Sequence, residues 1–140
     1  MAAPLDTNLF LTMPEASATS APPTASPSRF WADWSTQDFA RCKASGALEQ
    51  MIAVLPVAAT EQHGPHLPLK VDSALVDGVI AAALPHVPTD VPALFLPTQT
   101  VGLSPEHARF AGTLTLKAET TIRLWTDIGE SVAASGIKKL

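Results

Sequence analysis

The sequence predicts an α/β protein of three layers (α/β/α), in which a mostly parallel central sheet lies between two layers of helices. Two short aliphatic runs, at 51–59 and 91–100, alternate with two longer segments of helical periodicity, at 72–86 and 118–136. Apolar runs this short and this continuous are typical of strands that are buried on both faces. Strands that alternate with helices build a parallel sheet, so the order of the elements indicates the fold class.

The first ordered element is expected in the aromatic-rich segment RFWADWSTQDFARCKASG, at 29–46. Four of the chain's aromatic side chains lie there, which is too many to leave in water. Ser35 or Thr36 is a suitable N-cap for a short helix, and Gly46 is a suitable stop. The segment is therefore predicted to dock a helix on the core, which we favour over an aromatic binding pocket.

The first strand is expected in MIAVLPVAA, at 51–59. Its ladder should end or bulge at Pro56, because proline has no backbone N–H to donate. After a polar loop, a helix is predicted that stops before Pro85. Its apolar side chains recur at helical spacing: Leu75, Val76, Val79, Ile80 and Ala83.

The second strand is expected in VPALFLPTQT, at 91–100, and a loop leads from it to the last helix. That helix should end at Gly136. It places four apolar side chains on one face: Ile122, Trp125, Ile128 and Val132. The final residues, IKKL at 137–140, read as the start of a further buried strand, so we expect an α/β domain that is truncated at its C-terminus.

Composition sets the broad class of the protein. The chain has 140 residues, a formal net charge of −4 and 46% hydrophobic residues, as expected for one domain. The mild acidic excess gives no electrostatic reason to expect nucleic acid or an anionic membrane as partner. A single cysteine, Cys42, excludes an internal disulfide and fits a reducing compartment. No apolar run approaches the roughly 20 residues of a membrane span, so a cytoplasmic location is predicted.

The N-terminal part differs in composition from the rest. Residues 14–28, PEASATSAPPTASPS, contain four prolines and no aliphatic side chain larger than alanine. Such a segment cannot offset the entropy of ordering. We therefore predict a disordered leader over 1–28 and a domain over 29–140.

The polar loop after the first strand carries the side chains of greatest chemical interest. Glu61 and His63 are two residues apart, so in an extended segment they project to the same side. They follow the end of a predicted strand, which is where open α/β sheets bind ligands. Asp72 stands at the start of the next helix. A Glu, a His and an Asp together form a suitable ligand set for Zn²⁺ or Mn²⁺.

Each of these residues also has a purely structural interpretation. Asp72 is an ordinary N-cap for a helix at 73–84. Glu61 can be a solvated loop charge, and His63 a hydrogen-bonded loop histidine. His66, three residues further on, has the same alternative. Spacing alone leaves a metal site and a stiff polar loop both open.

A second polar group lies in GLSPEHARFAGT, at 102–113. Ser104, Glu106 and His107 stand there between glycines, which suits the wall of a pocket. From the residues alone, a surface loop is the favoured interpretation.

Three segments of the sequence resemble the creatininase, or creatinine amidohydrolase, family. PVAATEQHGPHLPLKVD, at 56–72, is similar to the family's long signature, which contains Thr-Glu-Gln-His-Gly-Pro-His-Leu-Pro-Leu and then an Asp. SPEHARFAGTLTL, at 104–116, is similar to a second family motif. FWADWSTQDFA, at 30–40, resembles the family's opening helix. The resemblance covers about residues 29–140.

This resemblance implies a site and a chemistry. Glu61 and His63 would each bind a different metal ion, Asp72 would bridge the two ions, and Ser104 would contact the substrate. The family uses two divalent ions, Zn²⁺ or Mn²⁺, to hydrolyse C–N bonds in cyclic or linear amides. Such ions lower the pKa of a water and polarise the amide carbonyl. The expected partners are a small-molecule amide and, because members form rings, further copies of the chain.

The sequence also departs from the family pattern. Ala58 replaces a usual glycine and Ala111 a usual proline, both by a small residue. The family's later motifs, among them Asn-Gly-His-Gly-Gly-Asn, supply further ligands and the catalytic groups, and they do not occur in these 140 residues. We therefore expect a metal-dependent amidohydrolase that is incomplete or inactive in this form. The alternative is a non-catalytic truncated or split-gene fragment that needs a separate C-terminal chain.

Overall fold

The computed structural model describes residues 28–140, so the predicted leader lies outside the described residues except for Ser28. The described chain forms three α-helices and two short strands, joined by loops and 3-10 turns. In chain order they are α1 (Thr36–Ala44), β1 (Ile52–Val54), α2 (Val71–Ala83), β2 (Ala93–Phe95) and α3 (Ala118–Ser135).

The strands form a parallel sheet. β1 pairs with β2 in a register that places Ala53 opposite Leu94. Two further segments extend the parallel pairing. Phe30 bridges to Phe95 beside β2, and Lys139 bridges to Ile52 beside β1. The segment 137–140 therefore lies parallel to β1, as its sequence predicts for the start of another strand.

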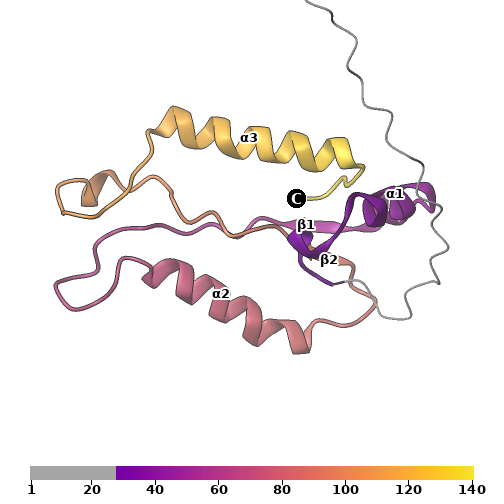
Figure 1. Ribbon diagram of the computed structural model, residues 1–140, viewed down its shortest axis with the longest axis horizontal. Coiled ribbons are helices and arrows are strands. Elements are labelled where there is room, and N and C mark those ends of the chain that lie inside the picture. The colour runs from indigo at the N-terminus through magenta and orange to yellow at the C-terminus, as the bar shows by residue number, and fades with distance from the viewer. Residues whose placement is uncertain (1–27) are drawn as a thin grey trace, which may run out of the picture.

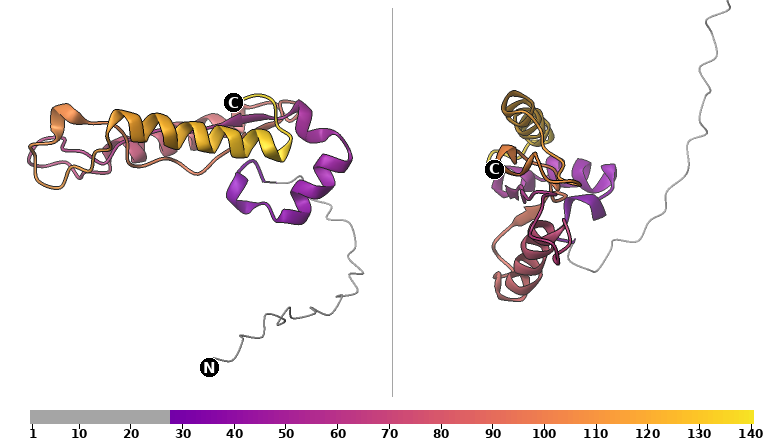
Figure 2. Two further views of the ribbon diagram at one scale, coloured as in Figure 1. Left: turned by 90° about the horizontal axis from the view of Figure 1, so that it is seen from above. Right: turned by 90° about the vertical axis from the view of Figure 1, so that its left-hand side faces the viewer.

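The helices lie on both faces of these strands. α3 covers one face and α2 the other, while α1 lies at the end near β1 (Figure 1). A view along the long axis shows the same order, with the strands between the two helices (Figure 2). The predicted α/β class, with helix layers around a parallel sheet, is confirmed.

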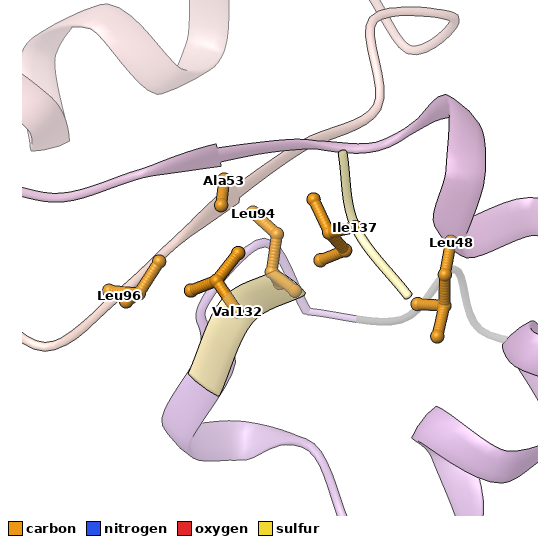
Figure 3. Packing of buried hydrophobic residues seen from close by; sticks show 6 residues of the cluster. All are labelled: Leu48, Ala53, Leu94, Leu96, Val132 and Ile137. Atoms are coloured by element: carbon orange, nitrogen blue, oxygen red, sulfur yellow. The ribbon is translucent and has the colours of Figure 1, made fainter. Parts of the chain in front are cut away.

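The apolar core lies on the α3 side of the sheet (Figure 3). Its six buried side chains come from both strands, from α3 and from the adjoining segments: Leu48, Ala53, Leu94, Leu96, Val132 and Ile137. Aromatic side chains of the first segment, Trp31, Trp34 and Phe39, pack against this cluster. Docking of the aromatic-rich segment on the core, the interpretation favoured from sequence, is confirmed.

The helix ends follow the predicted signals. Ser35 accepts a hydrogen bond from the Asp38 N–H, and the Asp38 carboxylate accepts from the Ser35 N–H, which together form a capping box for α1. α3 ends at Gly136, whose φ of 114° is a conformation that favours glycine.

The apolar faces of α2 and α3 are only partly covered. Leu75 and Val79 of α2 and Ile122 of α3 are exposed, whereas Val132 at the other end of α3 is buried. No helix among residues 28–140 has the length and apolarity of a membrane span.

Candidate metal centre

The two polar loops singled out from sequence meet at one end of the molecule. They follow β1 and β2 and extend together to the left-hand end in Figure 1, beyond the strands' carboxyl ends. An antiparallel bridge joins Thr60 to Leu114, and the Gln62 N–H donates to the Thr113 hydroxyl at 3.1 Å. This cross-link gives the first loop a defined position against the second.

Glu61, His63 and Asp72 come together at this end. Each offers one ligand atom, and these atoms all lie within 4.8 Å of one another. All three residues are half-buried, so the group is open to solvent on one side. The three residues for which the sequence suggested a metal site therefore form one cluster.

Asp72 is not the N-cap of α2, which corrects the structural alternative considered above. The helix begins at Val71, and the Ala74 N–H already donates to the Lys70 carbonyl at 2.9 Å. Asp72 thus lies inside the first turn. Its carboxylate is directed at His63 instead of capping the backbone.

The hydrogen bonds of His63 determine which ring nitrogen is free. Its Nδ1 lies 3.0 Å from the carbonyl oxygen of Glu61, which can only accept, so Nδ1 carries a proton. In the neutral ring Nε2 then has a lone pair, and it faces Oδ1 of Asp72 at 3.2 Å. Two acceptors at this distance repel each other unless a proton or a metal ion neutralises them.

The cluster fits a divalent ion. Two ligands at about 2.1 Å from a tetrahedral ion lie roughly 3.4 Å apart, close to the His63–Asp72 separation of 3.2 Å. A metal-binding histidine usually donates its other ring N–H to a carbonyl or carboxylate, as His63 does to the Glu61 carbonyl. The donors, one imidazole and two carboxylates, suit Zn²⁺ or Mn²⁺.

The surroundings of His63 also affect its proton. The Glu61 carbonyl, which accepts from the ring, is the main cause that raises the pKa of His63 above its ordinary 6.5. Desolvation of the ring acts in the opposite direction, and the negative charge of Asp72 adds to the increase. A proton and a metal ion therefore compete for the same nitrogen.

Ser104 lies in the wall of an open cleft beside the cluster. The cleft has a volume of about 540 Å³ and is lined by Glu61 and Asp72, by Ser104 and Glu106, and by apolar side chains that include Trp125. Ser104 is 1% exposed, and its hydroxyl has no hydrogen-bond partner among the described residues. An unpaired buried hydroxyl is costly, so it is a candidate for a contact with a bound molecule.

His107 and Gln62 belong to this end of the molecule, although sequence reasoning assigned neither of them to the site. Nε2 of His107 lies 3.5 Å from Oε1 of Glu61, and its Nδ1 lies 2.9 Å from the Gln62 side chain. The loop 102–113 is largely exposed, as the surface-loop interpretation expects, but its His107 also borders the candidate site. The sequence signal that could have assigned His107 to the site is its position in the second family-like motif, at 104–116.

Comparison with known proteins gives consistent matches. The family model described as "Creatininase: Creatinine amidohydrolase" matches residues 18–140. The mycofactocin precursor peptide peptidase of Mycobacterium tuberculosis (strain CDC 1551 / Oshkosh) is 37% identical over an alignment of 86 residues, and the match covers 57% of this chain and 34% of that protein. The chain spans about a third of the length of the curated relatives it matches.

Solved structures show the same likeness. A mutant creatininase of the Zn-Zn type has a TM-score of 0.67 and 28% sequence identity, over 82% of this chain and 44% of that one. A mutant creatininase complexed with creatine has a TM-score of 0.65 and 25% identity, over 81% of this chain and 43% of that one.

Proposed function

Because this chain belongs to the creatininase family, we propose that Glu61, His63 and Asp72 bind divalent metal for the hydrolysis of C–N bonds in amides. The observation that carries the proposal is the position of His63 Nε2, 3.2 Å from Asp72 Oδ1. Two acceptors this close need a proton or a metal ion between them, and the Nδ1–H bond to the Glu61 carbonyl leaves Nε2 available for the ion.

Two ions, Zn²⁺ or Mn²⁺, are the proposed complement of the full site. Glu61 and His63 would each hold one ion, and Asp72 would be shared between the two. Ions so held supply Lewis-acid polarisation of a carbonyl and lower the pKa of a water. The family match and the Zn-Zn type of a similar structure support this proposal.

The remaining ligands of a two-ion centre are proposed to come from outside the described residues. Three side chains shared between two ions provide two donors each, whereas catalytic zinc has about three protein ligands. The similar creatininase structures are more than twice as long as the part that this chain covers, which supports the same inference. Such residues can belong to the same polypeptide or to a separate chain.

The cleft beside the cluster is the proposed substrate site. Its wall is mainly apolar, and Ser104 adds a hydroxyl that is free to donate to or accept from an amide. The curated relatives are named as peptide peptidases and the solved structures as creatininases. Both names fit an amide-type C–N bond as the reacting group, and we propose that bond class.

Zinc titration of the metal-free chain tests the proposal. Asp72→Asn removes one charged ligand and should lower Zn²⁺ affinity by more than the roughly 10–100-fold that loss of an outer partner costs. Calorimetry or competition with a coloured chelator measures this affinity. The unfolding free energy of the metal-free protein should change by less than about 1 kcal/mol, since the site is only partly buried.

Asp77→Asn is the matched control, because Asp77 lies on the same helix and bonds to the Thr98 hydroxyl instead of His63. It should leave Zn²⁺ affinity unchanged. Equal Zn²⁺ binding by wild type and Asp72→Asn would show that the cluster is not the metal site.

A further inference from the structure

We infer that His107 is a positioning residue for Glu61: it directs its Nε2–H at the Glu61 carboxylate and so favours one orientation of a proposed metal ligand. The inference rests on the proposed function, because it concerns the same site. His107 is not itself a member of the metal cluster, whose three donors are supplied by Glu61, His63 and Asp72. Its Nε2 lies 3.5 Å from Oε1 of Glu61.

The orientation of Gln62 is the first step of the argument. The Gly64 N–H donates to Oε1 of Gln62 at 2.9 Å, and a backbone N–H cannot accept. The oxygen of the Gln62 amide is therefore on the Gly64 side. Its NH₂ group is on the other side, where Nδ1 of His107 lies 2.9 Å away.

The tautomer of His107 follows from this orientation. An amide NH₂ can only donate, so Nδ1 of His107 must accept and carries no proton. The neutral ring then holds its proton on Nε2, the nitrogen that faces Glu61. Gln62 thus sets the tautomer of His107, and His107 presents a donor to the carboxylate.

The His107 ring has an aromatic neighbour, and both side chains of the contact are partly shielded from water. The ring of Phe110 lies against that of His107, with centroids 6.2 Å apart. The side chains of His107 and Glu61 are 28% and 17% exposed, so water competes only partly for the contact. A donor to one carboxylate oxygen restricts rotation of the group and leaves the other oxygen for an ion.

This arrangement has a counterpart on the other side of Glu61. The Glu61 carbonyl accepts from Nδ1 of His63, while the Glu61 carboxylate faces Nε2 of His107. The two histidines have opposite tautomers: His63 leaves Nε2 free for an ion, and His107 keeps its proton there. One histidine therefore serves as ligand and the other as donor.

The tautomer can be measured directly in the metal-free protein. Long-range proton–nitrogen NMR correlations distinguish Nδ1–H from Nε2–H in each of the four histidines. His107 should show the Nε2–H pattern and His63 the Nδ1–H pattern. Gln62→Met, which removes the donor to Nδ1, should shift His107 toward a mixture of tautomers. An Nδ1–H pattern for His107 in the unmodified chain overturns the inference.

Two substitutions test the effect on metal. In His107→Gln the amide NH₂ reaches the position of Nε2 and can still donate to Glu61, whereas in His107→Asn the amide reaches only as far as Nδ1. His107→Asn should lower Zn²⁺ affinity about 10–100-fold, and His107→Gln should recover most of the loss. His86→Asn, at an exposed histidine outside the site, is the control and should change nothing.

The outcomes separate this inference from the proposed function. Equal loss of affinity in His107→Gln and His107→Asn, with the tautomer of His63 unchanged in both, overturns the role of the Nε2–H. A chain that binds no Zn²⁺ overturns the proposed function, and the tautomer of the metal-free protein then still supports or overturns the His107–Glu61 contact. The unfolding free energy of each variant shows whether a change in affinity reflects lost structure.

Discussion

The two ends of this molecule are held together by different interactions. At the core end, the six apolar side chains of the cluster in Figure 3 are each less than a tenth exposed. At the site end, the proposed ligand residues Glu61, His63 and Asp72 are only half-buried. There the loops are joined mainly by hydrogen bonds, such as those of Gln62 to Thr113 and to His107.

This difference indicates that the core end contributes most of the stability and that the site end carries the side chains available for chemistry. A side chain that binds an ion or a substrate must remain accessible, so it cannot contribute the free energy of full burial. The core end must supply that free energy for the whole domain. The same substitution should therefore have different effects at the two ends, and matched pairs of variants can measure the difference.

The largest effect is expected for Leu94→Ala. Leu94 lies in β2 and is 2% exposed, so its truncation removes apolar contacts and leaves a cavity in the core. The unfolding free energy should fall by about 2–5 kcal/mol. Urea denaturation followed by the fluorescence of the tryptophans measures it.

Leu75→Ala is the matched control, because it makes the same chemical change at a side chain that is 62% exposed. Its effect should stay within about 0.5 kcal/mol. If the two variants were equally destabilised, Leu75 would be covered in solution, and the contrast between the ends would not hold for α2.

A smaller effect is expected for Gly112→Ala, at the site end. Gly112 has a φ of 91°, and a Cβ atom there would lie 2.7 Å from Cδ1 of Leu69. An alanine in this conformation costs about 1–3 kcal/mol. Because Glu61 donates its N–H to the Leu69 carbonyl, displacement of Leu69 should also lower Zn²⁺ affinity. Thermal unfolding and zinc titration measure the two effects.

Gly78→Ala serves as the control for this substitution. Gly78 lies within α2, has nothing within 4 Å of the added methyl group and has no positive φ. Alanine should stabilise the helix there by about 1 kcal/mol. A loss of stability in both variants would contradict the assignment of strain to Gly112.

The sequence predicted the core end well because its signals are local. Ser35 caps α1 and Gly136 ends α3 through contacts within a few residues, and the strands follow from short aliphatic runs. The exposure of Leu75 was not predictable from the periodicity of α2, since periodicity gives a face but not what covers it. β1 ends at Val54, shortly before Pro56, where the ladder was predicted to end or bulge, and parallel pairing resumes beyond it with the Val57–Gln99 bridge.

The site end was predictable only in part. Glu61 and His63 were recognised by their spacing and by the family-like motif, but the position of Asp72 inside α2 depends on where the helix begins. The contact of His107 with Gln62 joins residues that are 45 apart in sequence, so no local signal describes it. The pairing of Thr60 with Leu114 brings side chains of the two loops together. These contacts depend on the folded structure and could not be predicted from the sequence.

The smallest effect concerns an ion pair at the core end. Nζ of Lys138 lies 2.8 Å from Oε2 of Glu49, and this hydrogen bond lowers the pKa of Glu49 below its ordinary 4.5. The site end shows the opposite direction, since the pKa of His63 is raised.

A lowered carboxylate pKa contributes stability that is present above the unfolded value and is lost as the pH falls through the folded value. Wild type should therefore exceed Glu49→Gln slightly in urea midpoint at pH 7, and the difference should shrink as the pH falls below about 4.5. Asp38, whose pKa is also lowered by Ser35, titrates in both proteins, so its contribution cancels in the comparison. A midpoint difference that stays constant down to pH 3 would mean that the pair does not form in solution. In that case the segment 137–140 would be held beside β1 by Ile137 and the Lys139 backbone alone.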